Sequence, residues 1–355
     1  MYNRRKSRVV RIGGVPIGGD SPITIQSMTN TKTADVAATV AQIKALTDAG
    51  CEIVRVTVNT KEAAEGFKQI RRQIDHIPLV ADIHFDHHMA IAAIDAGADK
   101  IRINPGNIGS LERVKAVADA ARKRGIPIRV GVNSGSLEQD LVDKFNGPSA
   151  QGLAESALRN VRILEDLDFD NIVISMKASN IPMTLSAHQI LAPQVDYPLH
   201  IGITEAGTLY SGTIKSTAGL AGLLTQGMGD TLRISLTADP VEEVRAAKEL
   251  LQSLRLRNFG PEIISCPTCG RTEVDLIPLA EDVRRRIAHI TAPISIAIMG
   301  CAVNGPGEAR ECDIGIACGK GSGILFKKGQ VVRKIPEADM ADVLLEEIEK
   351  MIGGE

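Results

Sequence analysis

Cysteines gather in the last quarter of the chain, which predicts a metal or cofactor module there. The chain has 6 cysteines in 355 residues, and all but Cys51 lie in this quarter. Cys266 and Cys269 form a C-x-x-C knuckle, a spacing that suits a zinc half-site and a cluster half-site equally well. Cys301 follows in a loop of small residues, with Glu308 seven positions further on.

Three thiolates and one weak oxygen ligand would hold a [4Fe-4S] cluster with one iron open to a substrate oxygen. A zinc ribbon instead requires a second C-x-x-C, which this sequence lacks. Cys312 or Cys318 could supply a fourth thiolate, giving a closed cluster or a structural zinc site. Alternatively, both are small buried residues on or near a strand, and Cys51 is expected in the core.

The rest of the chain repeats one unit, a short β-branched run followed by a helical stretch such as 35–49, 110–124 or 240–254. Eight such units imply parallel strands, and over this length they match a (β/α)8 barrel of the TIM type. An open doubly wound sheet is the alternative, but no Gly-x-Gly-x-x-Gly turn follows the first strand. The expected strands are 21–28, 53–58, 79–84, 100–105, 128–133, 172–177, 199–204 and 231–236.

The pattern therefore predicts a barrel over 1–255, a linker over 256–262 and a small α/β domain over 263–355. In the small domain we expect five further features. These are a helix near 278–290, a strand near 294–299, a Gly/Pro-rich loop at 300–309, a hairpin at 324–335 and a final amphipathic helix at 336–352.

Polar side chains occupy one parity of the expected barrel strands, and the other parity is continuously apolar. Because side chains alternate across a strand, the apolar parity must pack on the helices and the polar parity must point into the lumen. These polar residues converge towards the C-terminal ends of the strands, where barrel enzymes place their chemistry. They are Arg55, Asp82, His84, Arg102, Asn104, Arg129, Asn133, Ser175, Lys177, Arg233 and Ser235, with Glu205 directly after the seventh strand.

The basic residues of this set outnumber its acids, Asp82 and Glu205, so the lumen requires an anion. Guanidinium groups match phosphate oxygens bidentately, and the excess of charge suggests two phosphates. Some of these residues could instead form internal salt bridges, for example Asp82 with an arginine. His87 and His88 resemble metal ligands, but we expect them to be ordinary polar residues at a helix N-terminus.

The composition argues against several other classes of protein. With 41 Lys and Arg against 43 Asp and Glu, 3% aromatic residues and no Trp, the chain is not built to hold nucleic acid. No apolar run approaches the ~20 residues that span a bilayer. The N-terminus has basic residues but no apolar signal region, so we expect a short strand there and a cytoplasmic protein.

Several segments together resemble the 4-hydroxy-3-methylbut-2-enyl diphosphate synthase family, the iron–sulfur enzymes of the non-mevalonate isoprenoid pathway. The resemblance covers nearly the whole chain and matches the short bacterial two-domain form. The segments are QSMTNT (26–31), ADIHF (81–85), KIRINPGN (100–107), GITEAG (202–207), TLRISLTADPVEE (231–243), SCPTCGR (265–271) and GCAVNGPGEA (300–309).

The resemblance implies an oxidoreductase that opens 2-C-methyl-D-erythritol 2,4-cyclodiphosphate reductively. It implies Cys266, Cys269, Cys301 and Glu308 as ligands of a [4Fe-4S] cluster, and Glu205 as the acid near the reacting carbons. The family pattern does not call for thiols at 312 and 318. Around the diphosphate it implies Arg55, His84, Arg102, Arg129, Asn133, Lys177 and Ser235.

It further implies flavodoxin or ferredoxin as electron donor, and a homodimer in which each cluster domain caps the partner's barrel. The short linker points to the same assembly, because the last barrel helix ends at the face opposite the active-site mouth. The alternative from another class is a pterin-type barrel transferase with a structural zinc domain. A non-catalytic anion-binding module is a third reading, which Glu205 among so many cations makes improbable.

Overall fold

The structure, a computed structural model, describes residues 3–353. The chain divides into two compact units, Met1–Arg257 and Asn258–Glu355, and the division falls within the predicted linker 256–262. None of the helices in residues 3–353 is long and apolar enough to cross a membrane.

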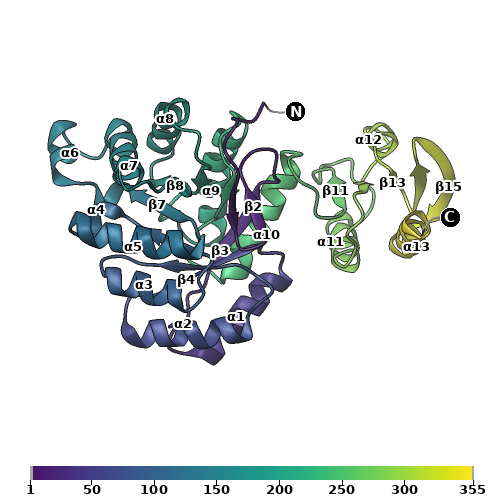
Figure 1. Cartoon of the computed structure of the whole chain (residues 1–355). Helices are drawn as coiled ribbons and strands as arrows, with labels where there is room; N and C mark the ends of the chain where they lie inside the picture. The colour runs from purple at the N-terminus through teal and green to yellow at the C-terminus, as the bar shows by residue number, and fades with distance from the viewer. Residues whose placement is uncertain (1–2, 354–355) are drawn as a thin grey trace. The chain divides into compact units, whose positions relative to one another are not determined.

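The first unit is a (β/α)8 barrel, as the repeated pattern predicts. Within the described residues its parallel strands follow the order β8-β7-β6-β5-β4-β3-β10-β9, and a parallel bridge from Ile174 to Leu199 joins the two ends (Figure 1). The strands are β3 (Thr24–Met28), β4 (Ile53–Thr57), β5 (Leu79–Asp82), β6 (Lys100–Ile103), β7 (Ile128–Asn133), β8 (Ile172–Lys177), β9 (His200–Ile201) and β10 (Thr231–Leu232).

The last two strands are shorter than the predicted 199–204 and 231–236. A backbone hydrogen bond from Arg233 N to Ile201 O still joins the two segments. Beyond it, the N–H of Leu236 donates to a carboxylate oxygen of Glu243 at 3.0 Å. The N–H of Leu236 is therefore bonded to a side chain and not to a neighbouring strand.

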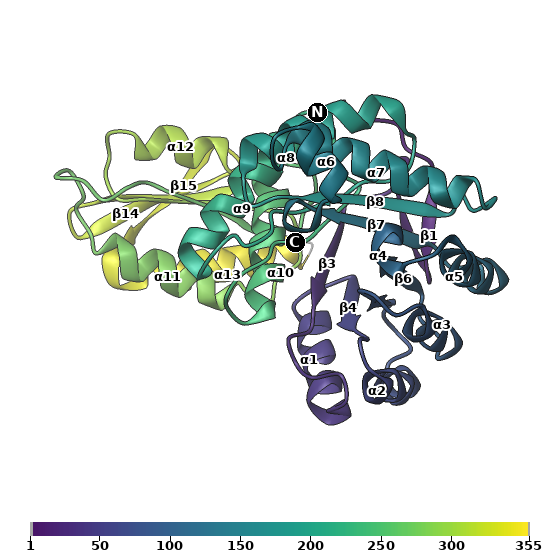
Figure 2. The same cartoon turned by 90° about the vertical axis from the view of Figure 1, so that its left-hand side faces the viewer.

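Helices surround the strands (Figure 2). The apolar strand parity packs beneath them as expected, and Val54, Ile101, Val130 and Ile174 are fully buried. The long helices are α1 (Val36–Asp48), α2 (Lys61–Gln73), α3 (His87–Asp95), α5 (Leu111–Arg124), α7 (Ala150–Glu165), α8 (Ile181–Leu191), α9 (Leu209–Leu224) and α10 (Pro240–Ser253), with short helices α4 (Pro105–Ile108) and α6 (Gln139–Lys144).

A hairpin precedes the barrel, where the sequence predicted a single short strand. It pairs β1 (Val10–Ile12) with β2 (Val15–Ile17). Its apolar side chains form one buried cluster with Ile53, Val80 and Val173, which stand at or near the beginnings of three barrel strands. The hairpin therefore covers the N-terminal end of the lumen.

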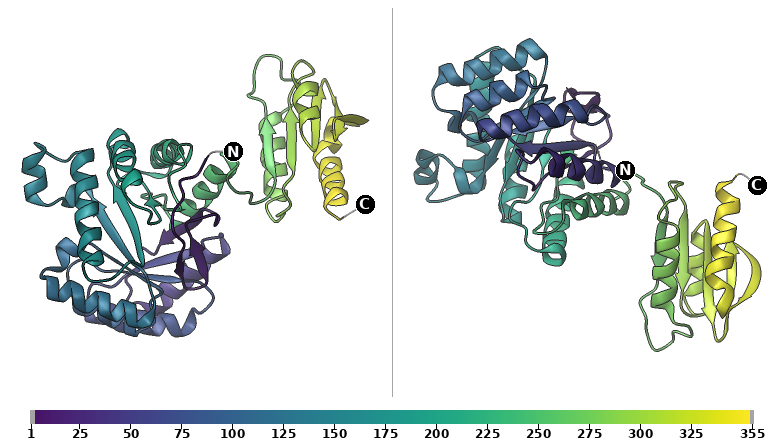
Figure 3. Two further views of the ribbon diagram at one scale, coloured as in Figure 1. Left: turned by 45° about the horizontal axis from the view of Figure 1, so that its top comes forward. Right: turned by 90° about the horizontal axis from the view of Figure 1, so that it is seen from below.

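The second unit is a small α/β domain with a five-stranded sheet in the order β11-β12-β13-β14-β15 (Figure 3). Helices α11 and α13 pack on one face and α12 packs on the other. The bounds are β11 (Glu262–Ser265), α11 (Leu276–Arg286), β12 (Ser295–Met299), α12 (Gly305–Glu311), β13 (Ile314–Gly319), β14 (Ser322–Lys327), β15 (Gln330–Pro336) and α13 (Met340–Ile352).

Two expectations for this unit are corrected. The predicted loop at 300–309 contains the start of α12, because Pro306 fits a first helical turn despite the glycines around it. The final helix begins at Met340 rather than at residue 336, since Pro336 ends β15 and a 3-10 turn follows it.

Candidate active site

The predicted polar parity does meet inside the barrel, around Asp82. This carboxylate is 2% exposed. It lies 3.3 Å from Arg102 Nη1, 3.9 Å from Arg55 Nε and 3.9 Å from His84 Nε2. Burial alone would raise the pKa of Asp82, but the charges of Arg55 and Arg102 lower it to about 2. Asp82 is therefore a permanent anion that holds neighbouring cations in place.

Arg129 lies in register with Arg102 on the neighbouring strand and is 1% exposed. Among the described residues, its Nε and Nη1 atoms have no hydrogen-bond partner. Burial and the charges of Arg55 and Arg102 hold the pKa of Arg129 well below its usual range. Burial and the charges of Arg129 and Arg55 also hold the pKa of Lys177 well below its usual range. Both effects identify a space that favours an incoming anion.

Two glycines on the inward parity make room for these cations. A Cβ atom at Gly131 would lie 2.4 Å from Arg102 Nε, and one at Gly202 would lie 2.7 Å from Lys177 Nζ. Because no Cβ atom fits at such distances, each glycine provides the space that a long basic side chain fills. Sequence periodicity alone does not reveal this role.

Three lumen residues were missed by the sequence analysis: Lys100, His200 and Gln26. All are at most 1% exposed, and Lys100 Nζ donates to Gln26 Oε1 at 3.3 Å across the lumen. Burial and the charge of Arg129 hold the pKa values of Lys100 and His200 well below their usual ranges. Parity could have found Lys100, since it precedes Arg102 by two positions.

The remaining predicted residues lie near the C-terminal ends of the strands. His84 is exposed, and Asn133 and Ser235 are half-buried. Asn104 accepts a hydrogen bond from Gly106 N as the N-cap of α4, which gives it a local structural task. Glu205 is exposed, and its φ of +51° is a left-handed conformation that only its surroundings can maintain.

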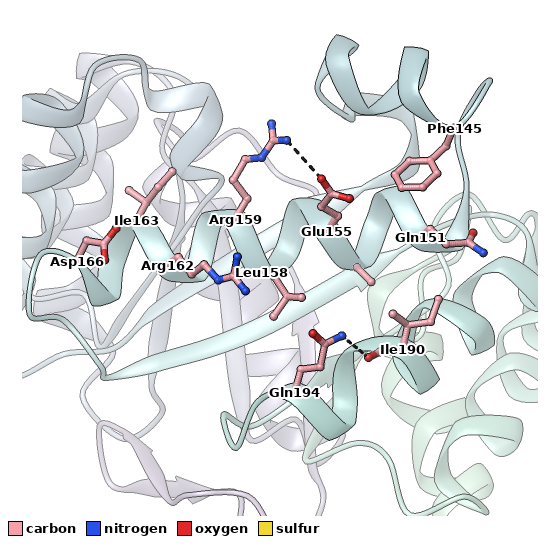
Figure 4. A pocket seen from close by; sticks show the side chains of 11 residues that line it. Phe145, Gln151, Glu155, Leu158, Arg159, Arg162, Ile163, Asp166, Ile190 and Gln194 are labelled. Carbon is pink, nitrogen blue, oxygen red and sulfur yellow. Dashed lines mark hydrogen bonds and ion pairs between the residues drawn. The ribbon is translucent and has the colours of Figure 1, made fainter.

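A groove of about 640 Å³ lies elsewhere, on the outer wall between α7 and α8 (Figure 4). Its lining holds as many acidic as basic side chains, and Arg159 pairs with Asp140 at 2.9 Å and with Glu155 at 3.7 Å. The groove contains none of the residues that the sequence singled out, and its paired charges call for no anion.

In the second unit, three cysteines follow the C-terminal ends of the adjacent parallel strands β11 and β12. Cys266 and Cys301 are half-buried and Cys269 is exposed. The N–H of Gly300 donates to Cys266 Sγ at 3.2 Å. Backbone N–H groups of Val303 and Asn304 lower the pKa of Cys301, so this thiol is prepared to act as a thiolate ligand.

Cys312 and Cys318 have a different environment. They are 4% and 0% exposed, and they belong to apolar clusters on opposite faces of the sheet. Burial raises the pKa of Cys312 and raises that of Cys318 to about 12. These two thiols match the expectation of small core residues, and Cys51 is buried as expected.

The donor set therefore fits an iron–sulfur cluster. Three accessible or half-buried thiols stand at one end of the sheet, with backbone N–H groups directed at two of them. Glu308 lies in the first turn of α12, which begins four residues after Cys301. Thiolate ligands with N–H donors to sulfur are the environment that such clusters require.

The two units define a class of protein: a barrel with a basic lumen joined to a cysteine-rich α/β domain. Family models match both units, the GcpE TIM-barrel domain over residues 7–248 and the GcpE protein C-terminal domain over residues 262–350. The chain belongs to the GcpE family.

Relatives extend over nearly the whole chain. A protein of Geobacter sulfurreducens is 56% identical over 349 residues, covering 98% of this chain and 99% of the relative. One of Bacillus pumilus is 57% identical and covers 98% and 94% respectively. Both carry the name 4-hydroxy-3-methylbut-2-en-1-yl diphosphate synthase (flavodoxin).

Among solved structures, a dihydropteroate synthase from Stenotrophomonas maltophilia matches 70% of this chain and 98% of its own, with a TM-score of 0.51. At 16% identity this likeness shows the barrel fold alone. The family membership favours the synthase interpretation over the pterin-type transferase.

The lumen geometry predicts that Arg129→Met weakens binding of inorganic pyrophosphate roughly 10- to 100-fold, the scale of a lost charge-assisted hydrogen bond. Arg102→Met should do the same, because both guanidinium groups line the same space. Calorimetric titration measures the change. The matched control is Arg159→Met in the outer groove, which should bind as the wild type does. Unchanged affinity in both lumen variants would contradict an anion site there.

Proposed function

We propose that this protein converts 2-C-methyl-D-erythritol 2,4-cyclodiphosphate to 4-hydroxy-3-methylbut-2-enyl diphosphate. Two electrons enter, the ring C–O bond to phosphate breaks, and a hydroxyl group leaves as water. The observation that carries the proposal is the convergence of buried cations around Asp82 in a space that lacks a matching number of acids. A cyclic diphosphate supplies the missing negative charge.

The lumen residues bind and orient this substrate. Arg55, Arg102, Arg129 and Lys177 hold the two phosphates, so that ring opening leaves the product anchored while its carbon atoms react. Asp82 attracts the guanidinium groups of Arg55 and Arg102 and so holds both in place. His84, Asn133 and Ser235, near the strand ends, complete the phosphate contacts.

The cofactor is a [4Fe-4S] cluster held by Cys266, Cys269, Cys301 and Glu308. When bound, it supplies electrons and a Lewis-acidic iron to the substrate. A flavodoxin is the proposed electron donor, since the relatives bear that word in their names. Cytoplasm is the compartment in which reduced thiols and such a donor are both present.

Glu205 is the proposed acid, which donates a proton to the leaving hydroxyl group. It follows β9, and Lys215 Nζ donates to its backbone oxygen at 3.5 Å. Its carboxylate is exposed in the isolated barrel. A general acid of this kind contributes about 10²- to 10⁴-fold to the rate.

The ligand assignment predicts iron content. Cys266→Ser, Cys269→Ser and Cys301→Ser should each lose iron after anaerobic purification, because each removes a thiolate. Cys312→Ser and Cys318→Ser are the matched controls and should remain brown with full iron, since their thiols lie in apolar clusters. Loss of iron from either control would replace Glu308 by that thiol.

The acid assignment predicts that Glu205→Gln keeps its fold, its cluster and its affinity for substrate, but turns over at least ~10²-fold more slowly. Anaerobic turnover of the cyclic diphosphate with a chemical reductant measures this. Near-normal turnover would give Glu205 a structural role, and a wild-type protein that leaves the cyclic diphosphate unchanged would refute the proposed function.

We further propose a homodimer in which each cluster domain caps the partner's barrel. The chain leaves the barrel near the N-terminal ends of the strands, where Arg257 donates to Ile23 O and pairs with Glu52. Residues 258–261 then reach at most ~14 Å before β11 begins. A strand such as β8 is ~20 Å long, which is more than these residues can span. The cluster domain of a second copy therefore caps the mouth of the barrel more readily than the cluster domain of the same chain.

Exposed apolar residues in both units support this proposal. Phe85 and Tyr210, which follow the ends of β5 and β9, are 71% and 81% exposed. In the second unit, Val303 and Ile277 lie near the cysteines in sequence and are each 63% exposed. Exposed apolar side chains mark an interaction site when they form a contiguous patch, and the proposed dimer would bring these residues together.

The dimer predicts complementation. Dimers of Glu205→Gln chains turn over slowly and dimers of Cys266→Ser chains lack iron, but a mixed dimer built in trans has one intact site. Random pairing makes about half the dimers mixed, so dissociation and reassociation should return about one quarter of wild-type activity. If the site is completed within one chain, no mixture recovers activity.

A further inference from the structure

One carboxylate outside the lumen, that of Glu243, accepts two hydrogen bonds on each of its oxygen atoms. Glu243 lies on α10 and is 3% exposed. Its Oε2 accepts from Ser27 Oγ at 2.8 Å and from Arg233 Nε at 3.0 Å. Its Oε1 accepts from Arg233 Nη2 at 2.9 Å and from Leu236 N at 3.0 Å. The arrangement is a two-bond fork on a guanidinium group, with each oxygen shared by a second donor.

This fork determines where Arg233 points. Its Nε and Nη2 atoms are occupied by Glu243, while Nη1 lies 3.6 Å from Met28 Sδ, the sulfur that Arg55 also contacts at 2.8 and 3.1 Å. Arg233 is thereby held on the same side of the barrel as Arg55, which it repels. Without Glu243 the two guanidinium groups would separate, since like charges repel one another strongly in a low dielectric.

The same carboxylate fixes a loop. Its bond to Leu236 N holds the segment between β10 and α10, and the next residue, Thr237, donates from its N–H to Gly207 O at 2.9 Å. A parallel bridge also joins Thr237 to Thr208. Gly207 lies two residues after Glu205, whose left-handed backbone requires such support.

We infer that Glu243 is a positioning residue for the reaction, which aims Arg233 at the diphosphate and steadies the loop that carries Glu205. The inference rests on the proposed function, and it assigns α10 a task beyond covering the sheet. Ser27 is the second partner that holds the carboxylate in this orientation.

The test combines Glu243→Gln with Arg233→Met in the full-length, cluster-loaded protein. An amide offers one acceptor in place of two, so Glu243→Gln breaks one arm of the fork. We expect the dissociation constants of the cyclic diphosphate and of inorganic pyrophosphate to rise roughly 10-fold or more. We also expect a lower kcat, with unchanged cluster absorption. The matched control is Glu242→Gln, the half-buried neighbour that pairs with Arg245 along the helix and should bind as the wild type does.

The double variant decides whether Glu243 acts through Arg233. If it does, adding Glu243→Gln to Arg233→Met weakens binding by no more than about 2- to 3-fold, because coupled residues are not additive. The double variant removes both buried charges together and so leaves no unpaired charge in the interior. It therefore keeps the test valid if the single variant fails to fold. Additive losses, or wild-type affinity in Glu243→Gln, would overturn the inference, as would a lower melting temperature with unchanged affinity and kcat.

The two ligands separate this inference from the proposed function. Failure of the wild type to bind the cyclic diphosphate would refute the function, while the pyrophosphate series would still test the Glu243 contact. Failure of the wild type to bind pyrophosphate would overturn the inference itself.

Discussion

Basic side chains inside one narrow barrel repel one another, and this repulsion is the constraint on which the arrangement of the first unit depends. Removing a guanidinium group from water disfavours its charge, and a second one nearby disfavours it further. The pKa of Arg55 accordingly falls to about 10, with burial as the main cause and Asp82 opposing it. This mutual repulsion favours the binding of an anion among the cations, which is the physical basis of the diphosphate site that we propose.

Two carboxylates hold different members of this set of basic side chains in place. Asp82 lies inside the lumen between Arg55 and Arg102, while Glu243 reaches Arg233 from a helix on the outside. Neither carboxylate neutralises the whole set, so orientation is fixed while net positive charge remains. Gly131 and Gly202 complete the arrangement, because the missing Cβ atoms leave space for the long side chains.

The second unit sorts its thiols by environment. Cys266, Cys269 and Cys301 follow the ends of parallel strands, where a backbone N–H donates to the sulfur of Cys266 and others lower the pKa of Cys301. Cys312 and Cys318 lie in apolar clusters, where burial raises their pKa values and keeps them protonated. The cysteines of this small domain therefore lie in two different chemical environments, and their positions relative to the sheet determine which one each cysteine has.

The period-two alternation of strands such as KIRIN and IRVGVN was sufficient to predict a barrel with a charged interior, since parity alone separates the two faces of a strand. The C-x-x-C knuckle and the loop around Cys301 could likewise be recognised from the sequence, because ligand chemistry requires particular residue types at close spacing.

The contacts of Glu243 could not be predicted from the sequence, although this residue lies in one of the segments that carry the family resemblance. They depend on how α10 packs against β3 and β10, whose residues are more than 200 positions apart in the case of Ser27. The burial of His200 and the pairing of Lys100 with Gln26 likewise follow from strand register around a closed barrel. Such convergence of distant segments is decided by packing, and only the tertiary structure contains it.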